Sequence, residues 1–135
     1  MMAEDRILVV DDNATNLKLV AYLMKASGYT VDTALDAEAA TERIRARRPD
    51  VILMDIQLPG IDGLELTRRL KADPATRDIV IIAVTAYAMK GDHARALDAG
   101  CDDYIAKPID TRLLPETIAR HLASRRAGAR TGGRA

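Results

Sequence analysis

The sequence predicts an α/β fold, a doubly wound parallel sheet with helices on both faces. Two observations support it. Short runs rich in aliphatic residues alternate about five times with helical patterns, which is typical of parallel α/β folds. Three of the apolar runs are also followed by a polar or acidic residue. Ligands bind at the carboxyl ends of strands in such sheets, so we expect the chemistry of this chain there.

Five segments are expected to be strands: Ile7–Val10, Thr30–Ala34, Val51–Met54, Ile79–Val84 and Tyr104–Ala106. The first, third and fourth are continuous apolar runs, as in strands buried on both faces, whereas the other two are weaker and suit edge or short strands. Asp11, Asp55 and Thr85 directly follow the three strong runs.

Five segments are expected to be helices: Thr15–Ser27, Asp36–Arg47, Leu64–Ala72, Asp92–Ala99 and Thr111–Ala123. Gly28 and Gly100 are expected to end the first and fourth of them, and Asp110 is a candidate N-cap for the last. His93 and His121 lie on expected helices among charged neighbours, so we expect them at the surface.

The 135 residues have the size of one domain, and 48% of them are hydrophobic, enough for a core. Lys and Arg number 20, as do Asp and Glu, so the overall charge favours neither nucleic acid nor an acidic membrane. Residues 124–135 contain four arginines and no acid. We therefore divide the chain into a domain over 1–123 and a disordered Arg/Gly-rich tail over 124–135.

The sequence also indicates a cytoplasmic protein. Cys101 is the only cysteine, which excludes an internal disulfide. The N-terminus is acidic where a signal peptide is basic, and its apolar run is too short to span a membrane.

Parallel strands in this order gather five polar residues at one edge of the sheet: Asp11, Asp12, Asp55, Thr85 and Lys107. Crowded carboxylates repel one another unless a cation neutralises them, and their oxygens suit Mg²⁺. No His or Cys belongs to this set, which argues against zinc. A lysine and a hydroxyl beside the acids indicate a bound phosphoryl group. Asp55 is the best nucleophile because it follows the central, most apolar run.

A simpler interpretation remains for each residue alone. Asp11 and Asp12 could merely cap the first helix, Lys107 could be a surface lysine, and Thr85 could simply end a strand. These interpretations leave the coincidence of all five residues unexplained.

Four blocks of sequence resemble those of response-regulator receiver domains, in the order and spacing of that family: Leu8–Asn13 (LVVDDN), Ile52–Gly63 (ILMDIQLPGIDG), Val84–Ala86 (VTA) and Tyr104–Ile109 (YIAKPI). The chain is most similar to single-domain cell-cycle regulators of the DivK type, and it also resembles receiver modules of hybrid histidine kinases. The resemblance covers roughly residues 6–122 and implies a flavodoxin-like (βα)5 sheet.

The resemblance implies a metal site for Mg²⁺. Asp55 would be both the phosphoacceptor and a ligand. Asp12 would bind the metal directly, Asp11 mainly through a coordinated water, and Gln57 through its backbone carbonyl.

The resemblance also implies residues that respond to the phosphoryl group. Thr85 would hydrogen-bond it and Lys107 would pair with it. The Lys107–Pro108 peptide would be cis, as X-Pro bonds allow. Tyr104 would be an aromatic switch that turns inward when Thr85 moves.

Two further hypotheses concern the surroundings of the site. Apolar residues spread over about 200° of the first expected helix, more than burial needs, so Leu17 and Leu19 are candidates for docking a helical phosphodonor. Tyr87 is a third candidate for partner docking. Ordinary exposed aliphatics are the alternative. Tyr87, two residues after Thr85, together with Gln57 is expected to border the phosphoryl group and to slow its hydrolysis.

The expected partners are therefore a histidine kinase or histidine phosphotransfer protein and a downstream protein target, with no nucleic acid or membrane. We expect a monomer or a weak homodimer that catalyses only its own phosphorylation and dephosphorylation. Two alternatives are a magnesium-dependent aspartyl-phosphate phosphatase or phosphotransferase and an inert receiver-like scaffold. The first commonly has an acid two residues after its nucleophile, where this chain has Gln57.

Overall fold

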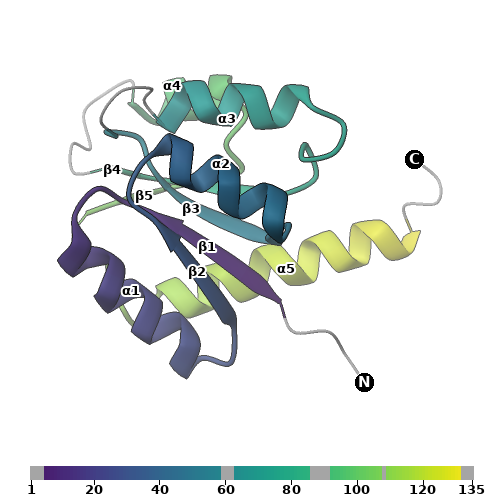
Figure 1. Cartoon of the computed structure of the whole chain (residues 1–135). Helices are drawn as coiled ribbons and strands as arrows, with labels where there is room; N and C mark the ends of the chain where they lie inside the picture. Colours follow the sequence, from purple (N-terminus) through teal and green to yellow (C-terminus); the bar gives the residue numbers. More distant parts are fainter. Residues whose placement is uncertain (1–4, 59–62, 86–91, 108, 132–135) are drawn as a thin grey trace.

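The computed structural model describes residues 5–58, 63–85, 92–107 and 109–131 (Figure 1). Its described residues form a five-stranded sheet in the order β2-β1-β3-β4-β5, in which every neighbouring pair is parallel. The strands are β1 (Arg6–Val10), β2 (Thr30–Ala34), β3 (Val51–Asp55), β4 (Val80–Thr85) and β5 (Asp103–Ala106). The sequence-based prediction of a parallel sheet is confirmed.

Helices cover both faces of this sheet. The described helices are α1 (Ala14–Ala26), α2 (Ala37–Ala46), α3 (Gly63–Ala72), α4 (Asp92–Ala99) and α5 (Leu114–Thr131). Figure 1 shows α1 and α5 on one face and α2, α3 and α4 on the other. Two separate hydrophobic clusters fill the two faces, one with residues of α1 and α5 and the other with residues of α2, α3 and α4.

Alternation along the strands divides the core between these clusters. Ile7 and Val9 of β1 pack toward α1 and α5, whereas Leu8 and Val10 pack toward the opposite face. Every residue of β3 and β4 is buried, which explains their continuous apolar runs. These two strands hold the centre of the sheet, and they carry Asp55 and Thr85 as their last residues.

Local signals fix where the helices begin and end. The Asn13 side chain caps α1 by accepting from the N–H of Asn16, and Asp36 caps α2 in the same way. Gly28 and Gly100 follow α1 and α4 with φ of 99° and 107°, a conformation that glycine adopts without strain. The expected stops at both glycines are confirmed.

The last helix differs from the prediction at both ends. Asp110 caps a turn by accepting from the N–H of Arg112, and α5 begins only at Leu114. The helix then continues to Thr131, past the expected end at Ala123. The residues beyond Ala123 are mostly alanine and arginine, which are good helix formers, so the composition that suggested a disordered tail also permits a helix. The division of the chain at residue 123 stays a prediction.

Bilayer-crossing helices need both length and apolar character. None of the helices in the described ranges combines the two.

Candidate functional site

The carboxyl ends of four neighbouring strands bring the predicted polar residues together. Asp11 follows β1, Asp55 ends β3, Thr85 ends β4 and Lys107 follows β5. The Lys107 N–H donates to the Thr85 carbonyl at 2.7 Å, so the lysine is fixed directly beside the end of β4. The gathering of these residues at one sheet edge, expected from the strand pattern, is present in the structure.

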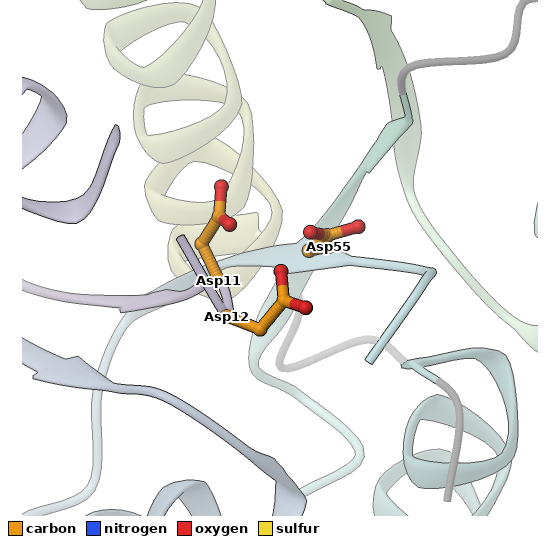
Figure 2. A group of neighbouring side chains, drawn as sticks. All are labelled: Asp11, Asp12 and Asp55. Atoms are coloured by element: carbon orange, nitrogen blue, oxygen red, sulfur yellow. The ribbon is translucent and has the colours of Figure 1, made fainter. Parts of the chain in front are cut away.

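Three carboxylates converge at this edge, as Figure 2 shows. One oxygen from each of Asp11, Asp12 and Asp55 lies within 4.8 Å of the others. Asp11 and Asp55 are buried, with 6% and 4% exposure, whereas Asp12 is exposed. The helix N-cap is Asn13, so capping alone does not account for the two preceding acids.

The following turns orient both buried carboxylates in the same manner. Asp11 Oδ1 accepts from the Asn13 N–H at 2.9 Å, and Asp55 Oδ1 accepts from the Gln57 N–H at 2.9 Å. In each case the other oxygen, Oδ2, faces Lys107. One oxygen of each acid is therefore held by backbone, and the second is directed into the site.

Lys107 links the two buried acids. Its Nζ lies 3.1 Å from Asp11 Oδ2 and 3.3 Å from Asp55 Oδ2. Burial acts to lower the pKa of Lys107, but the hydrogen bond to Asp11 and the charges of both acids raise it. The ammonium therefore stays charged and cannot act as a base at neutral pH.

Asp55 is held in an environment that resists its ionisation. Burial raises the pKa of Asp55 and outweighs the lowering by the Gln57 N–H and by Lys107, while the charge of Asp11 raises it further. One lysine shared by two buried carboxylates does not balance both of them. The arrangement thus leaves an excess of negative charge.

The donor set fits a hard divalent cation. It consists of carboxylate oxygens only, on Asp11, Asp12 and Asp55, and their spacing lets one ion contact all three. The carboxylates that remain uncompensated by Lys107 supply the charge that such an ion needs. The proposed ligand role of the Gln57 carbonyl stays a prediction, although Gln57 does lie at the rim of this cluster.

The sequence interpretation did not assign a role to Gly63, which packs behind Asp55. A Cβ at Gly63 would lie 2.3 Å from the Asp55 carbonyl oxygen and 2.9 Å from the Cα of Ile56. The Gly63 N–H also donates to the Ile56 carbonyl. The first turn of α3 therefore packs directly on the backbone of Asp55 and Ile56. The glycine that closes the quoted ILMDIQLPGIDG block was the available signal.

The predicted switch residues lie on adjacent strands. Thr85 is fully buried, and Tyr104 is partly buried on β5 opposite Ala83. Tyr104 packs against the cluster under α2, α3 and α4. Pro108, predicted to follow a cis peptide, and Tyr87 lie outside the described residues, and their roles stay predictions.

The docking prediction is wrong for one of its two leucines. Leu17 is 5% exposed and packs in the core, because it shares with Val20 and Met24 the face of α1 that covers the sheet. Leu19 is 54% exposed, as docking requires. Leu17 is therefore a core residue.

Leu19 borders a groove of about 460 Å³ that sequence alone did not indicate. We call it the Lys107 groove, because the lysine of the acidic cluster lies at its wall. Its lining comes from α1 and from the segment before α5: Asn16, Leu19, Val20, Leu23, Lys107, Ile109 and Thr111. An apolar surface thus continues directly into the polar site.

Comparison with known sequences identifies related proteins. The family model for the response regulator receiver domain matches residues 7–119. The polar-differentiation response regulators DivK of Brucella anthropi and Brucella abortus strain S19 are each 47% identical to this chain over 116 residues. The matched region is 86% of this chain and 94% of each relative.

Solved structures resemble the fold closely. A CheY-like response regulator receiver domain protein from Methanospirillum hungatei JF-1 has a TM-score of 0.86 and 31% identity, covering 93% of this chain and 98% of its own. The receiver domain of the sensor histidine kinase PA1611 from Pseudomonas aeruginosa PAO1 has a TM-score of 0.79 and 37% identity. That match covers 87% of this chain and 97% of the receiver, which was crystallised with magnesium coordinated in its active site cleft.

Proposed function

Because this chain belongs to the response regulator receiver domain family of two-component signalling, we propose that Asp55 accepts a phosphoryl group from a phosphohistidine. The donor is a histidine kinase or a histidine phosphotransfer protein, and the product is a protein switch in the cytoplasm. The observation that carries the proposal is the contact of one ammonium, Lys107, with both Asp11 and Asp55 beside a third carboxylate.

The transfer exchanges one bond to phosphorus for another. An oxygen of Asp55 forms a bond to phosphorus while the bond from phosphorus to the donor imidazole breaks, and the imidazole leaves with the electron pair. Lys107 is within reach of Asp55 and neutralises charge on the oxygens of the transferred group. In this proposal Thr85, the last residue of the neighbouring strand β4, donates its hydroxyl to one of them.

Mg²⁺ is the cofactor that the three carboxylates suit, and Asp11, Asp12 and Asp55 would hold it. When bound, it supplies positive charge that lets a negative phosphoryl group approach negative carboxylates. The magnesium in the cleft of the PA1611 receiver supports the same assignment for this chain.

The output is a change of protein contacts at β5 and α5. Thr85 pairs in register with Ala106, two residues after Tyr104, so a shift of the threonine reaches the edge strand of the sheet directly. Phosphorylation then biases an equilibrium between two conformations of this edge. The downstream partner is a protein, and the chain acts as a monomer or a weak homodimer.

Acetyl phosphate tests the chemistry without any protein donor. The chain incubated with acetyl phosphate and Mg²⁺ should gain the mass of one phosphoryl group, and a chelator should prevent it. Asp55→Asn should gain none. Asp98→Asn, which removes an exposed carboxylate of α4 that is not part of the acidic cluster, should be phosphorylated like the unaltered chain. Phosphorylation of Asp55→Asn at the normal rate would refute the proposal.

The Lys107 groove is the docking surface we propose for the donor. It carries exposed Leu19 and partly buried Leu23 and Ile109 next to the acceptor site, so a helix lying there brings its histidine close to Asp55. Apolar anchors beside the reacting groups align the two proteins and leave the groups that carry out the phosphoryl transfer free to react.

A single substitution separates docking from chemistry. Leu19→Asp should slow transfer from a phosphorylated histidine donor by about tenfold or more and leave phosphorylation by acetyl phosphate unchanged. Leu97→Asp is the matched control, because Leu97 is 49% exposed but belongs to α4 on the opposite face. Equal transfer to both variants would exclude the groove as the docking surface.

A further inference from the structure

A second groove lies along the other side of α1 and contributes nothing to the acceptor site. It occupies about 430 Å³ between α1 and the edge strand β2, and we call it the α1–β2 groove. Its lining shares no residue with that of the Lys107 groove: Ala14, Leu17, Lys18, Ala21, Tyr22, Lys25, Thr33 and Leu35. The two grooves therefore form separate surfaces on either side of one helix.

The walls of this groove expose large apolar side chains. Tyr22 on α1 is 74% exposed and Leu35, which follows β2, is 49% exposed. They are distant in sequence but line the same groove, whose floor includes buried Leu17 and Ala21. An exposed tyrosine and leucine over an apolar floor form the kind of patch that a protein partner covers.

The charged residues that line the groove have one sign. Lys18 and Lys25 are exposed and line it, and no acid is among the described residues of its lining. Arg43 of α2 adds a third cation at the edge, where its Nε donates to the Thr33 carbonyl at 3.2 Å. A complementary partner therefore carries carboxylates around an apolar centre.

The spacing of the lysines selects a helical partner. Lys18 and Lys25 are seven residues apart on α1, which separates their backbones by about 10.5 Å along the helix axis. Two carboxylates seven residues apart on a second helix have the same separation and lie on one face. A helix aligned with α1 can thus pair both lysines while its apolar residues contact Tyr22 and Leu35.

An added β-strand suits this edge less well. The Ala34 carbonyl accepts from Asp11 and the Thr30 N–H donates to Asp5, so alternate backbone groups of β2 point toward β1. Thr33 belongs to the outward set, and Arg43 already bonds its carbonyl. A strand that paired with β2 would have to displace this arginine.

We infer that the α1–β2 groove binds an acidic amphipathic helix of a partner protein, with Asp or Glu seven residues apart and aliphatic residues between them. The inference is independent of phosphoryl transfer, because none of the lining residues belongs to the acceptor site or to the Lys107 groove. It identifies a second contact surface that can be occupied together with the acceptor edge.

A synthetic peptide tests the inference on the full chain. The probe is a stapled helix with Glu at two positions seven residues apart and Leu three and four residues after the first, and its control has Lys in place of both Glu. Titration of the ¹⁵N-labelled chain should shift the amides of Tyr22, Thr33 and Leu35. Lys18→Glu combined with Lys25→Glu should weaken binding by about tenfold or more, and added salt should weaken it too.

Charge-matched variants make the result specific. Arg45→Glu combined with Arg47→Glu changes two exposed cations outside the groove and should leave the affinity unchanged. Equal binding of the Lys-containing peptide, shifts confined to the Lys107 groove, or no binding at all would overturn the inference. Binding of the peptide as an added strand, or self-association of the chain that masks Tyr22, would assign the groove to another occupant and would also overturn it.

Discussion

Asp55, the proposed acceptor, and its partner Lys107 do not balance each other's charge. Asp55 is 4% exposed, and burial raises its pKa, which opposes the anionic form needed for attack. Lys107 favours that anion but also contacts Asp11, so its charge is divided between two acids. A bound cation would complete the balance. We therefore expect loss of Lys107 to lower the free energy of unfolding most when no metal is present.

Lys107→Met tests this balance. The substitution leaves two buried carboxylates without their ammonium, so the variant should lose about 1–3 kcal/mol of unfolding free energy in chelator at neutral pH. Mg²⁺ should stabilise the variant more than the unaltered chain, because the cation no longer meets a competing positive charge. Urea unfolding with and without Mg²⁺ measures both effects.

Lys25→Met is the control for this experiment. Lys25 is an exposed lysine near the end of α1, and it is not the lysine that pairs with the buried acids. It should change neither the unfolding free energy nor the response to Mg²⁺. If Lys107→Met proved as stable as the unaltered chain in chelator, the lysine would not balance the buried acids.

The residues of the site could be predicted from the sequence, because the carboxyl ends of parallel strands lie at one edge of the sheet. That rule placed Asp11, Asp55, Thr85 and Lys107 together, as the structure does. The rule predicts no contacts, so the sharing of Lys107 between two acids is seen only in the structure. The packing of Gly63 on the Asp55 carbonyl was missed for the same reason, because a close approach between backbones leaves no periodic pattern.

At the scale of elements, α1 shows what helical periodicity can and cannot predict. Leu17 and Leu19 are equally apolar, yet one is buried and the other exposed, because a separation of two residues places them about 200° apart. The breadth of the apolar arc correctly indicated an exposed surface but not which leucine belonged to it. Tyr22, the most exposed large apolar residue described on α1, was not used in the docking hypothesis.

The end of α5 was the least predictable element boundary. Leu114, Ile118 and Leu122 recur every four residues and are buried, and Leu122 is the last buried side chain described on the helix. Beyond it no apolar period continues, so the sequence suggested an end at Ala123. The backbone nevertheless stays helical to Thr131, as the alanines and arginines of this part allow, and in Figure 1 it continues past the sheet.

Truncation after Ala123 tests whether residues 124–135 are separable from the domain. Since the described burial on α5 ends at Leu122, the truncated chain should lose less than about 1 kcal/mol of unfolding free energy. It should still be phosphorylated by acetyl phosphate. Leu122→Ala, which opens a cavity in the core, should cost about 2–5 kcal/mol in the same denaturant titration. A truncated chain as unstable as Leu122→Ala would show that the domain includes the whole helix.

At the scale of the whole molecule, we expect stability at low pH to depend on an ion pair between the edge strand β5 and the last helix α5. Asp103 of β5 lies 2.7 Å from His121 Nε2 and 3.7 Å from Arg120, both on α5. His121 was expected at the surface, but it is partly buried against this carboxylate. This pair could not be predicted from sequence patterns, because it joins residues 18 positions apart on different elements.

The sign of the pH effect follows from the direction of the shift. Burial acts to raise the pKa of Asp103, but hydrogen bonds from His121 and from the Tyr104 N–H, with the nearby positive charges, lower it below the ordinary value. A carboxyl whose pKa is lower in the folded than in the unfolded chain stabilises the fold above the unfolded value, about 4. That stabilisation is lost as the pH falls through the folded value.

Asp103→Asn should therefore be less stable than the unaltered chain near neutral pH, by about 1 kcal/mol for a partly buried charged hydrogen bond. The difference should persist down to about pH 5 and close below about pH 4, where the unaltered chain also loses the charge. Urea unfolding at a series of pH values measures it, with Asp98→Asn on the exposed face of α4 as control. A difference that stayed constant through pH 3 would show that Asp103 acts through its shape and neutral hydrogen bonds. In that case the connection between β5 and α5 would not weaken in acid.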